Sequence, residues 1–306
     1  MYQRYLIAVL LVIVLVGCTT PPPEQATQDP NVTPEGVRIT PDVVYGHKFG
    51  MALTFDMFQP ENQNGAGVIL INSGGWRSYF PNLYEYTADS IRLKTQEIKI
   101  EPFLSKGFTV FWVRHGSSPK FEMHEIVSDL RSALRFIRFH AEEYGVDAER
   151  LGIQGGSAGG HLSLLLATTA ETGNSEVTEE FEKGSGRVAA VVAYFPATDL
   201  KRLVRDFKAS DPEILKQMPA LDISDDQLTE YSPINFVTAE DPPILIIFGD
   251  RDFVIQGELM YQALQEAGVE SKLVVIPGAG HGFEGEDADF ALSEAVNWFE
   301  EHLGEK

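Results

Sequence analysis

The stretch Gly155-Gly156-Ser157-Ala158-Gly159-Gly160 decides the fold of this 306-residue chain. It matches Gly-x-Ser-x-Gly, the pattern of a nucleophilic serine on a tight turn between a strand and a helix. Small residues must flank such a serine, and glycine tolerates a strained backbone at the least cost. The surrounding sequence fits this turn, because residues 149–154 predict a short buried strand and residues 158–169, rich in Ala and Leu, predict a helix.

A serine hydroxyl is a weak nucleophile, so it needs a base, and the base needs an acid that orients it. Residues 272–276 predict a strand that leads into a glycine-rich loop containing His281. An imidazole in such a loop can reach a serine at the end of a neighbouring strand. The other six histidines fit this role less well, because they precede the serine or lie in a predicted hairpin or on predicted helices: His47, His115, His124, His140, His161 and His302.

Two aspartates are candidates for the orienting acid. Residues 243–248 predict a buried strand that runs directly into Gly249-Asp250-Arg251-Asp252. Asp250 and Asp252 follow the same strand, so the pattern alone leaves both open.

A third strand, residues 68–71, leads into Asn72-Ser73-Gly74-Gly75-Trp76. Acyl transfer places negative charge on the former carbonyl oxygen, and each backbone N–H aimed at it contributes roughly 3 kcal/mol. Gly74 and Gly75 let the backbone approach that closely, and the N–H of Ala158 is the expected third donor. These three residues are the predicted oxyanion hole.

At these residues the chain resembles the α/β-hydrolase superfamily, and within it carboxylesterases of the hormone-sensitive-lipase-like and bacterial feruloyl-esterase-like groups. The resemblance rests on residues 155–161, 249–254 and 278–283 and covers the chain from Val43 onward. It implies Ser157 as nucleophile, His281 as base and Asp252 as acid, with Asp250 supporting the loop. The chain departs from these groups at Asn72 and Ser73, where His and Gly are usual, but backbone donors do not depend on those side chains.

Apolar runs alternate with helical patterns, which predicts an α/β fold with a mostly parallel sheet and helices on both faces. Residues 39–45 and 51–58 predict an antiparallel hairpin, in which Pro41 fits only an edge strand. We assign residues 37–306 to one catalytic domain. Within it, the resemblance makes residues 195–237 a cap insertion over the site, with a surface excursion as the alternative.

Aromatic residues flank the predicted site. Trp76, Phe195 and Phe283 are candidates for lining a substrate pocket, with core packing as the alternative for each. The long segment 79–106 adds aromatic residues soon after the oxyanion loop: Tyr79, Phe80, Tyr84 and Tyr86.

The N-terminus carries an apolar leader after Arg4 that is too short to span a membrane. It ends at Cys18, the only cysteine, in a Leu-Val-Gly-Cys box typical of bacterial lipoproteins. We therefore predict a signal peptide at residues 1–17, a Pro-rich linker at 18–36, and a lipid anchor on Cys18 at the bacterial cell envelope. An ordinary signal peptide or a short anchor is the alternative. With no second cysteine, an intrachain disulfide and a thiolate metal site are excluded.

The net charge of −21 argues against a nucleic-acid partner and against direct adsorption to anionic lipid. The combined patterns and the family resemblance predict a serine carboxylesterase that uses neither a metal nor an organic cofactor. The resemblance implies an ester carried on a polysaccharide, and a small-molecule ester is the alternative. A serine peptidase of the prolyl-oligopeptidase type and a noncatalytic surface-binding protein are the alternatives. The oligomeric state and the natural ester stay open.

Overall fold

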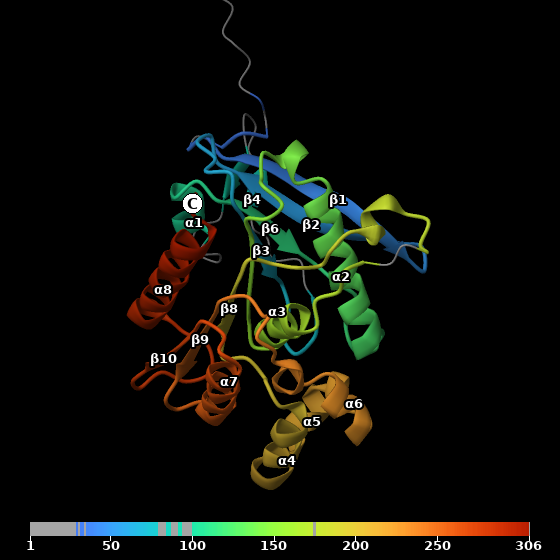
Figure 1. The fold of residues 1–306 in the computed structure, drawn as a ribbon, viewed down its shortest axis with the longest axis vertical. Helices are drawn as coiled ribbons and strands as arrows, with labels where there is room; N and C mark the ends of the chain where they lie inside the picture. Colours follow the sequence, from blue (N-terminus) through green and yellow to red (C-terminus); the bar gives the residue numbers. More distant parts are fainter. Residues whose placement is uncertain are drawn as a thin grey trace, which may run out of the picture.

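An eight-stranded, mostly parallel sheet forms the centre of the molecule (Figure 1). The computed structural model describes residues 29, 31–33, 35–78, 84–86, 91–93, 100–173 and 176–305. The strands lie in the order β1-β2-β6-β3-β7-β8-β9-β10, and β4 pairs with β5 separately. Their bounds are β1 Arg38–Lys48, β2 Met51–Gln59, β3 Gly67–Ile71, β4 Tyr84–Tyr86, β5 Ile91–Leu93, β6 Thr109–Val113, β7 Leu151–Gly156, β8 Ala190–Tyr194, β9 Ile244–Gly249 and β10 Ser271–Ile276.

The central strands are buried along almost their whole length because helices cover both faces of the sheet. All six residues of β9 are buried, as are all five of β6. From β6 to β10 every pairing is parallel, whereas β1 pairs with β2, and β2 with β6, in the antiparallel sense. The predicted hairpin is confirmed, and Pro41 lies in the edge strand β1 where the register shifts between Thr40 and Val43.

Side chains alternate between two hydrophobic cores, one on each face of the sheet. In β3, for example, Ile69 and Ile71 face the core under α2, α3 and α7, whereas Val68 faces the core under α1 and α8. The period of two along each strand thus produces the two layers of helices. The helices are α1 Glu101–Ser105, α2 Met123–Phe139, α3 Ala158–Thr168, α4 Leu200–Ser210, α5 Pro212–Gln217, α6 Asp225–Glu230, α7 Val254–Ala267 and α8 Gly285–Leu303.

The segment predicted as an insertion, residues 195–237, follows the carboxyl end of β8. It forms α4, α5 and α6 together with the short 3₁₀ helices Pro219–Leu221 and Pro233–Phe236. Figure 1 shows α4, α5 and α6 gathered at one end of the molecule, away from the β1–β2 hairpin. The N-cap side chains Asp199 and Ser224 accept backbone N–H groups at the starts of α4 and α6.

Some sequence-based predictions lie outside the described residues. They are the signal peptide, most of the linker with Cys18, and the aromatic residues Tyr79 and Phe80; Tyr84 and Tyr86 belong to β4. Among the helices that the structure describes, none combines the length and apolar character needed to cross a membrane.

Candidate active site

Ser157 is the single residue that connects a strand to a helix. β7 ends at Gly156 and α3 begins at Ala158, and Ser157 itself has φ 55° and ψ −118°. A positive φ is costly for a residue with a Cβ, roughly 1–3 kcal/mol. The Ser157 N–H donates to the carbonyl oxygen of Tyr194 over 2.9 Å, which ties the turn to the end of β8. The strained turn projects the hydroxyl away from the sheet edge.

The glycines around Ser157 are required for space and not for unusual backbone angles. A Cβ on Gly155 would lie 2.5 Å from the backbone carbon of Gly159, and one on Gly159 would lie 2.7 Å from the carbonyl oxygen of Ile71. The sequence-based expectation that glycine absorbs the strain is therefore corrected. The serine carries the positive φ, and the glycines let α3 pack directly on β7 and β3.

A chain of hydrogen bonds joins three side chains from three loops. The Oγ of Ser157 lies 3.0 Å from Nε2 of His281, and Nδ1 of His281 lies 2.9 Å from Oδ2 of Asp252. These loops follow β7, β10 and β9, whose carboxyl ends meet at one edge of the sheet. The Asp252 side chain is 3% exposed, whereas that of His281 is 55% exposed. The acid is thus buried and the imidazole is open to solvent.

Asp250 has a different contact. Its Oδ1 accepts the N–H of Gly278 over 2.7 Å, which joins the loop after β9 to the loop after β10. The backbone adds a second link, because the Arg251 N–H donates to the carbonyl oxygen of Ala279. Of the two candidate aspartates, the structure brings Asp252 to the imidazole and leaves Asp250 as a brace between the loops.

The loop after β3 folds into a two-residue hairpin turn. Gly74 and Arg77 exchange two backbone hydrogen bonds of 3.0 and 3.1 Å, and Gly75 and Trp76 between them have φ values of 57° and 59°. Positive φ at both central residues is the pattern of a type I′ turn. Because the Gly74 N–H donates to Arg77, the prediction of Gly74 as an oxyanion donor is corrected. Gly75 and Ala158 both line the cavity beside Ser157, and Gly74 does not.

Trp76 anchors this turn to the nucleophile helix. Its indole N–H donates to Nδ1 of His161 over 3.0 Å, and Nε2 of His161 lies 2.7 Å from the carbonyl oxygen of Tyr231. An indole only donates and a carbonyl only accepts, so His161 must carry its proton on Nε2. Complete burial lowers the pKa of His161 to about 4, which keeps it neutral. His161 therefore joins the oxyanion loop, α3 and the 195–237 segment.

Backbone strain is concentrated around the site. Among the described residues, five that are not glycine have positive φ: Asp42, Phe49, Trp76, Ser157 and Phe195. Three of them, Trp76, Ser157 and Phe195, line one cavity. Strained residues of this kind cluster at functional sites, where the surrounding structure holds them in place.

That cavity has a volume of about 260 Å³. Phe195 lines it, as predicted, and its ring also packs on His281 with 4.8 Å between centroids. Phe283 is not among the lining residues. It packs edge-on against Phe195 at 5.0 Å and supports it from behind, so its predicted pocket role is corrected. The sequence did not single out four further lining residues, all from the 195–237 segment: Leu203, Phe207, Ile214 and Met218.

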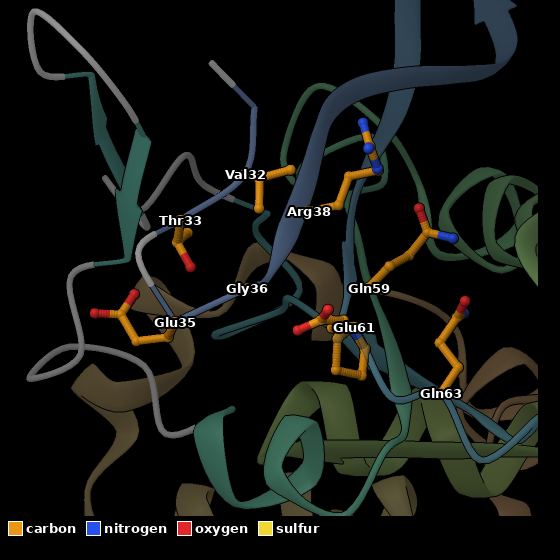
Figure 2. A pocket seen from close by; sticks show the side chains of 9 residues that line it. Val32, Thr33, Glu35, Gly36, Arg38, Gln59, Glu61 and Gln63 are labelled. Atoms are coloured by element: carbon orange, nitrogen blue, oxygen red, sulfur yellow. The ribbon is translucent and has the colours of Figure 1, made fainter. Parts of the chain in front are cut away.

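A larger, open groove lies elsewhere, with a volume of about 610 Å³. Figure 2 shows its side chains on the segment before β1 and on the connection from β2 to β3. This connection precedes β3, so the groove lies near the opposite end of that strand from the loop that carries Gly75. Two of its polar side chains are engaged: Nε2 of Gln63 donates to Thr109 and Tyr144, and Nε2 of Gln59 donates to Tyr144. The groove has no nucleophile and base pair, and we assign the chemistry to the cavity at Ser157.

The sheet order and the serine turn define this molecule as an α/β-hydrolase. The chain matches the BD-FAE family over residues 55–264 and belongs to that family.

Three known proteins illustrate the similarity. Esterase LipC of Mycobacterium tuberculosis is 28% identical over 59% of this chain and 46% of its own length. The acetylxylan esterase of Xylanibacter ruminicola is 27% identical over 74% of this chain and 42% of its own length. The chain thus spans less than half the length of these two relatives. The propionate-bound structure of the esterase Est2 from Thermogutta terrifontis is 26% identical, with a TM-score of 0.63, and 86% of this chain and 92% of that chain are covered.

Proposed function

We propose that the protein is a serine carboxylesterase. The observation that carries this proposal is the continuous hydrogen-bonded chain from Asp252 through His281 to Ser157 at the mouth of an apolar cavity. The esterase names of the relatives support the same reaction class.

The proposed reaction begins with transfer of the Ser157 hydroxyl proton to Nε2 of His281 as Oγ attacks the ester carbonyl carbon. Asp252 accepts the Nδ1–H and stays ionised, which fixes the imidazole tautomer and stabilises the imidazolium. Collapse of the tetrahedral intermediate breaks the bond to the alcohol, which takes its proton from His281 and leaves an acyl group on Ser157. Water, deprotonated by His281, then attacks the acyl carbon, and Oγ leaves with the proton.

The negative oxygen of both intermediates needs N–H donors. Ala158 is the first residue of α3, where an N–H has no acceptor within the helix. Gly75, on the type I′ turn, lines the same cavity as Ala158 and Ser157. We assign the oxyanion hole to these two N–H groups, and the cramped packing of α3 on the end of β3 fixes the distance between them.

The reaction class can be tested with a matched ester and amide. p-Nitrophenyl acetate and p-nitroacetanilide carry the same acyl group and differ in the bond that is cleaved, an activated ester in one and an anilide in the other. We expect efficient, Ser157-dependent hydrolysis of the ester and far slower hydrolysis of the anilide. An anilide rate comparable to the ester rate would favour the peptidase alternative, and no turnover of either would favour a binding protein.

We further propose that the enzyme is anchored at the bacterial cell envelope through a lipid on Cys18. The support is the leader ending in Leu15-Val16-Gly17-Cys18 and the Pro-rich stretch that follows it. In a bacterial host that processes lipoproteins, the wild-type chain should fractionate with membranes and Cys18→Ser should not be processed at this site. A chain beginning at Asp29 should be active without membranes. If the Cys18→Ser chain were still processed at this site, the proposal of a lipid anchor on Cys18 would be contradicted.

We also propose that the alcohol portion of the ester belongs to a polysaccharide. The acetylxylan esterase relative supports an ester carried on a polysaccharide, and the exposed His281 leaves room for a large alcohol on the solvent side.

A further inference from the structure

The segment between β8 and β9 supplies one end of the cavity beside Ser157 with apolar side chains. Leu203 and Phe207 of α4, Ile214 of α5 and Met218 after it contribute side chains to this wall. Phe253 completes it from the start of α7, with its ring edge-on to Phe207 at 5.2 Å. None of these five side chains offers a hydrogen bond to an occupant.

Apart from Ser157, His281 and Asp252, Gln256 is the one residue, of those described, that lines the cavity with a polar, non-aromatic side chain, and most of its hydrogen-bonding capacity is taken within the protein. Its Oε1 accepts the N–H groups of Thr198 and Asp199 over 2.9 and 2.8 Å. Its Nε2 donates to the carbonyl oxygen of Asp199 over 3.2 Å. The side chain is 2% exposed. Gln256 thus holds the start of α4 in place, and its Oε1 is fully engaged, so that only the second N–H of Nε2 is left to meet a ligand.

The direction of the ester in the site follows from where the alcohol must leave. The alcohol oxygen takes its proton from His281, so the alcohol lies beside the imidazole. The His281 side chain is 55% exposed, so this side opens to solvent. The acyl group, on the other side of the carbonyl carbon, is left to enter the apolar end of the cavity.

We propose, on the basis of the serine esterase function, that this end of the cavity is an acyl pocket for short aliphatic groups and that it disfavours hydroxycinnamoyl groups. The whole cavity beside Ser157 has a volume of about 260 Å³, which lies below the ~300–1,000 Å³ of pockets that enclose drug-sized ligands. Each methylene buried in it should raise kcat/KM about fourfold until the pocket is full. A hydroxyl buried there without a partner should lower kcat/KM about ten- to hundredfold.

The experiment compares two acyl series and one alcohol series. p-Nitrophenyl esters from acetyl to decanoyl keep the leaving group constant, and kcat/KM should rise and then fall as the chain outgrows the pocket. Methyl cinnamate and methyl 4-hydroxycinnamate differ by one hydroxyl, and the hydroxylated ester should be the slower one. Alkyl acetates from ethyl to hexyl should show a flatter dependence than the acyl series.

Variants of residues in this apolar wall test whether its side chains limit the length of the acyl chain. Ile214→Ala and Met218→Ala should each move the optimum of kcat/KM to longer acyl chains than in the wild type. Lys208→Ala, an exposed neighbour of Phe207 on α4, should leave the profile unchanged.

The outcomes separate this inference from the proposed function. If the wild-type protein hydrolyses no ester, or if ester hydrolysis survives in Ser157→Ala, the proposed serine esterase function is refuted. Ser157-dependent hydrolysis with a flat acyl profile, a preference for the 4-hydroxycinnamate, or a steeper dependence on the alcohol chain would each overturn the acyl pocket alone.

Discussion

The two loops that meet at Ser157 are held in opposite ways. The oxyanion loop is held at its buried residues: the Trp76 side chain is fixed by His161, and the carbonyl oxygen of the buried Ser73 accepts the N–H of Gly159 over 3.2 Å. The loop that carries His281 is open, and its imidazole is restrained chiefly by one carboxylate, that of Asp252.

This difference matches what each loop must do. Backbone N–H groups stabilise an oxyanion best when they are fixed in advance, because then nothing reorganises as charge develops. A general base must instead exchange protons with the serine, the alcohol and water in one cycle, which requires access to solvent. We therefore expect changes in the buried loop to act through packing, and changes in the open loop to act through the imidazole.

The largest difference in activity should be between variants of the two aspartates that contact the loop carrying His281. Asp252→Asn should lower kcat on the order of 10⁴-fold, because the amide no longer selects the imidazole tautomer that accepts the serine proton. Asp250→Asn should lower it less than about tenfold, since Asp250 only accepts the Gly278 N–H. Steady-state kinetics with p-nitrophenyl butyrate would measure both, and the reverse ranking would transfer the acid role to Asp250.

The packing of the buried loop can be tested with two glycines. Gly159→Ala would place a Cβ 2.7 Å from the carbonyl oxygen of Ile71 and push the oxyanion loop away from Ala158. Its kcat should fall about 10²–10³-fold, as when one oxyanion donor is lost. At Gly75 a Cβ meets nothing within 4 Å, so Gly75→Ala adds only the strain of φ 57° and should stay within about tenfold. Equal effects from the two variants would show that the distance between the donors is not set by this packing.

The anchor of the oxyanion loop should have a smaller effect on rate. Trp76→Phe removes the indole N–H and leaves Nδ1 of His161 buried without its donor, so the free energy of unfolding should fall by about 1–3 kcal/mol. We expect kcat to fall about tenfold with little change in KM. Trp298→Phe is the matched control, because the buried Nε1 of Trp298 has no hydrogen-bond partner among the described residues. A loss of stability with unchanged kcat would make the anchor purely structural.

The neutral histidine under the loop predicts a pH dependence of stability. The pKa of His161 is about 4 in the folded protein and about 6.5 in an unfolded chain. Between these values the unfolded state binds the extra proton, so the free energy of unfolding falls as the pH drops from 6.5 towards 4. His115, whose pKa is also lowered to about 4 by burial, adds to the same slope.

Urea unfolding at pH 6.5 and 4.5 would measure this slope. His161→Gln should make it shallower by up to about 1.4 kcal/mol per pH unit, the contribution of one proton. His124→Gln is the control, because the His124 side chain is 59% exposed. An unchanged slope in His161→Gln would mean that this histidine does not stay neutral in the folded protein.

The parts of the fold and of the site that depend on short stretches of sequence could be predicted from the sequence. Glycine-punctuated loops after apolar strands predicted Ser157 and His281 but left Asp250 and Asp252 open, and the family resemblance favoured Asp252. The structure brings Ser157, His281 and Asp252 within hydrogen-bond distance. The same patterns predicted the parallel sheet, because each strand is a short apolar run bounded by turn residues.

What the sequence could not provide depends on contacts between distant segments. Gly74 and Gly75 look equivalent in a glycine pair, and only the turn's hydrogen bonds to Arg77 decide which N–H remains available. The spacing of Leu203 and Phe207 predicts an apolar helix face but not that it lines a cavity. Phe283 looked like a pocket residue because of its place in the loop, yet it packs behind Phe195.

The most direct test of the central claim is the site of the acyl-enzyme. Rapid mixing with p-nitrophenyl butyrate, acid quenching and peptide mass analysis would locate the acyl group. We predict a burst of about one nitrophenolate per enzyme molecule, the butyryl group on the peptide containing Ser157, and neither burst nor turnover in Ser157→Ala. A butyryl group on another residue, or turnover retained in Ser157→Ala, would contradict the assignment of Ser157 as the nucleophile.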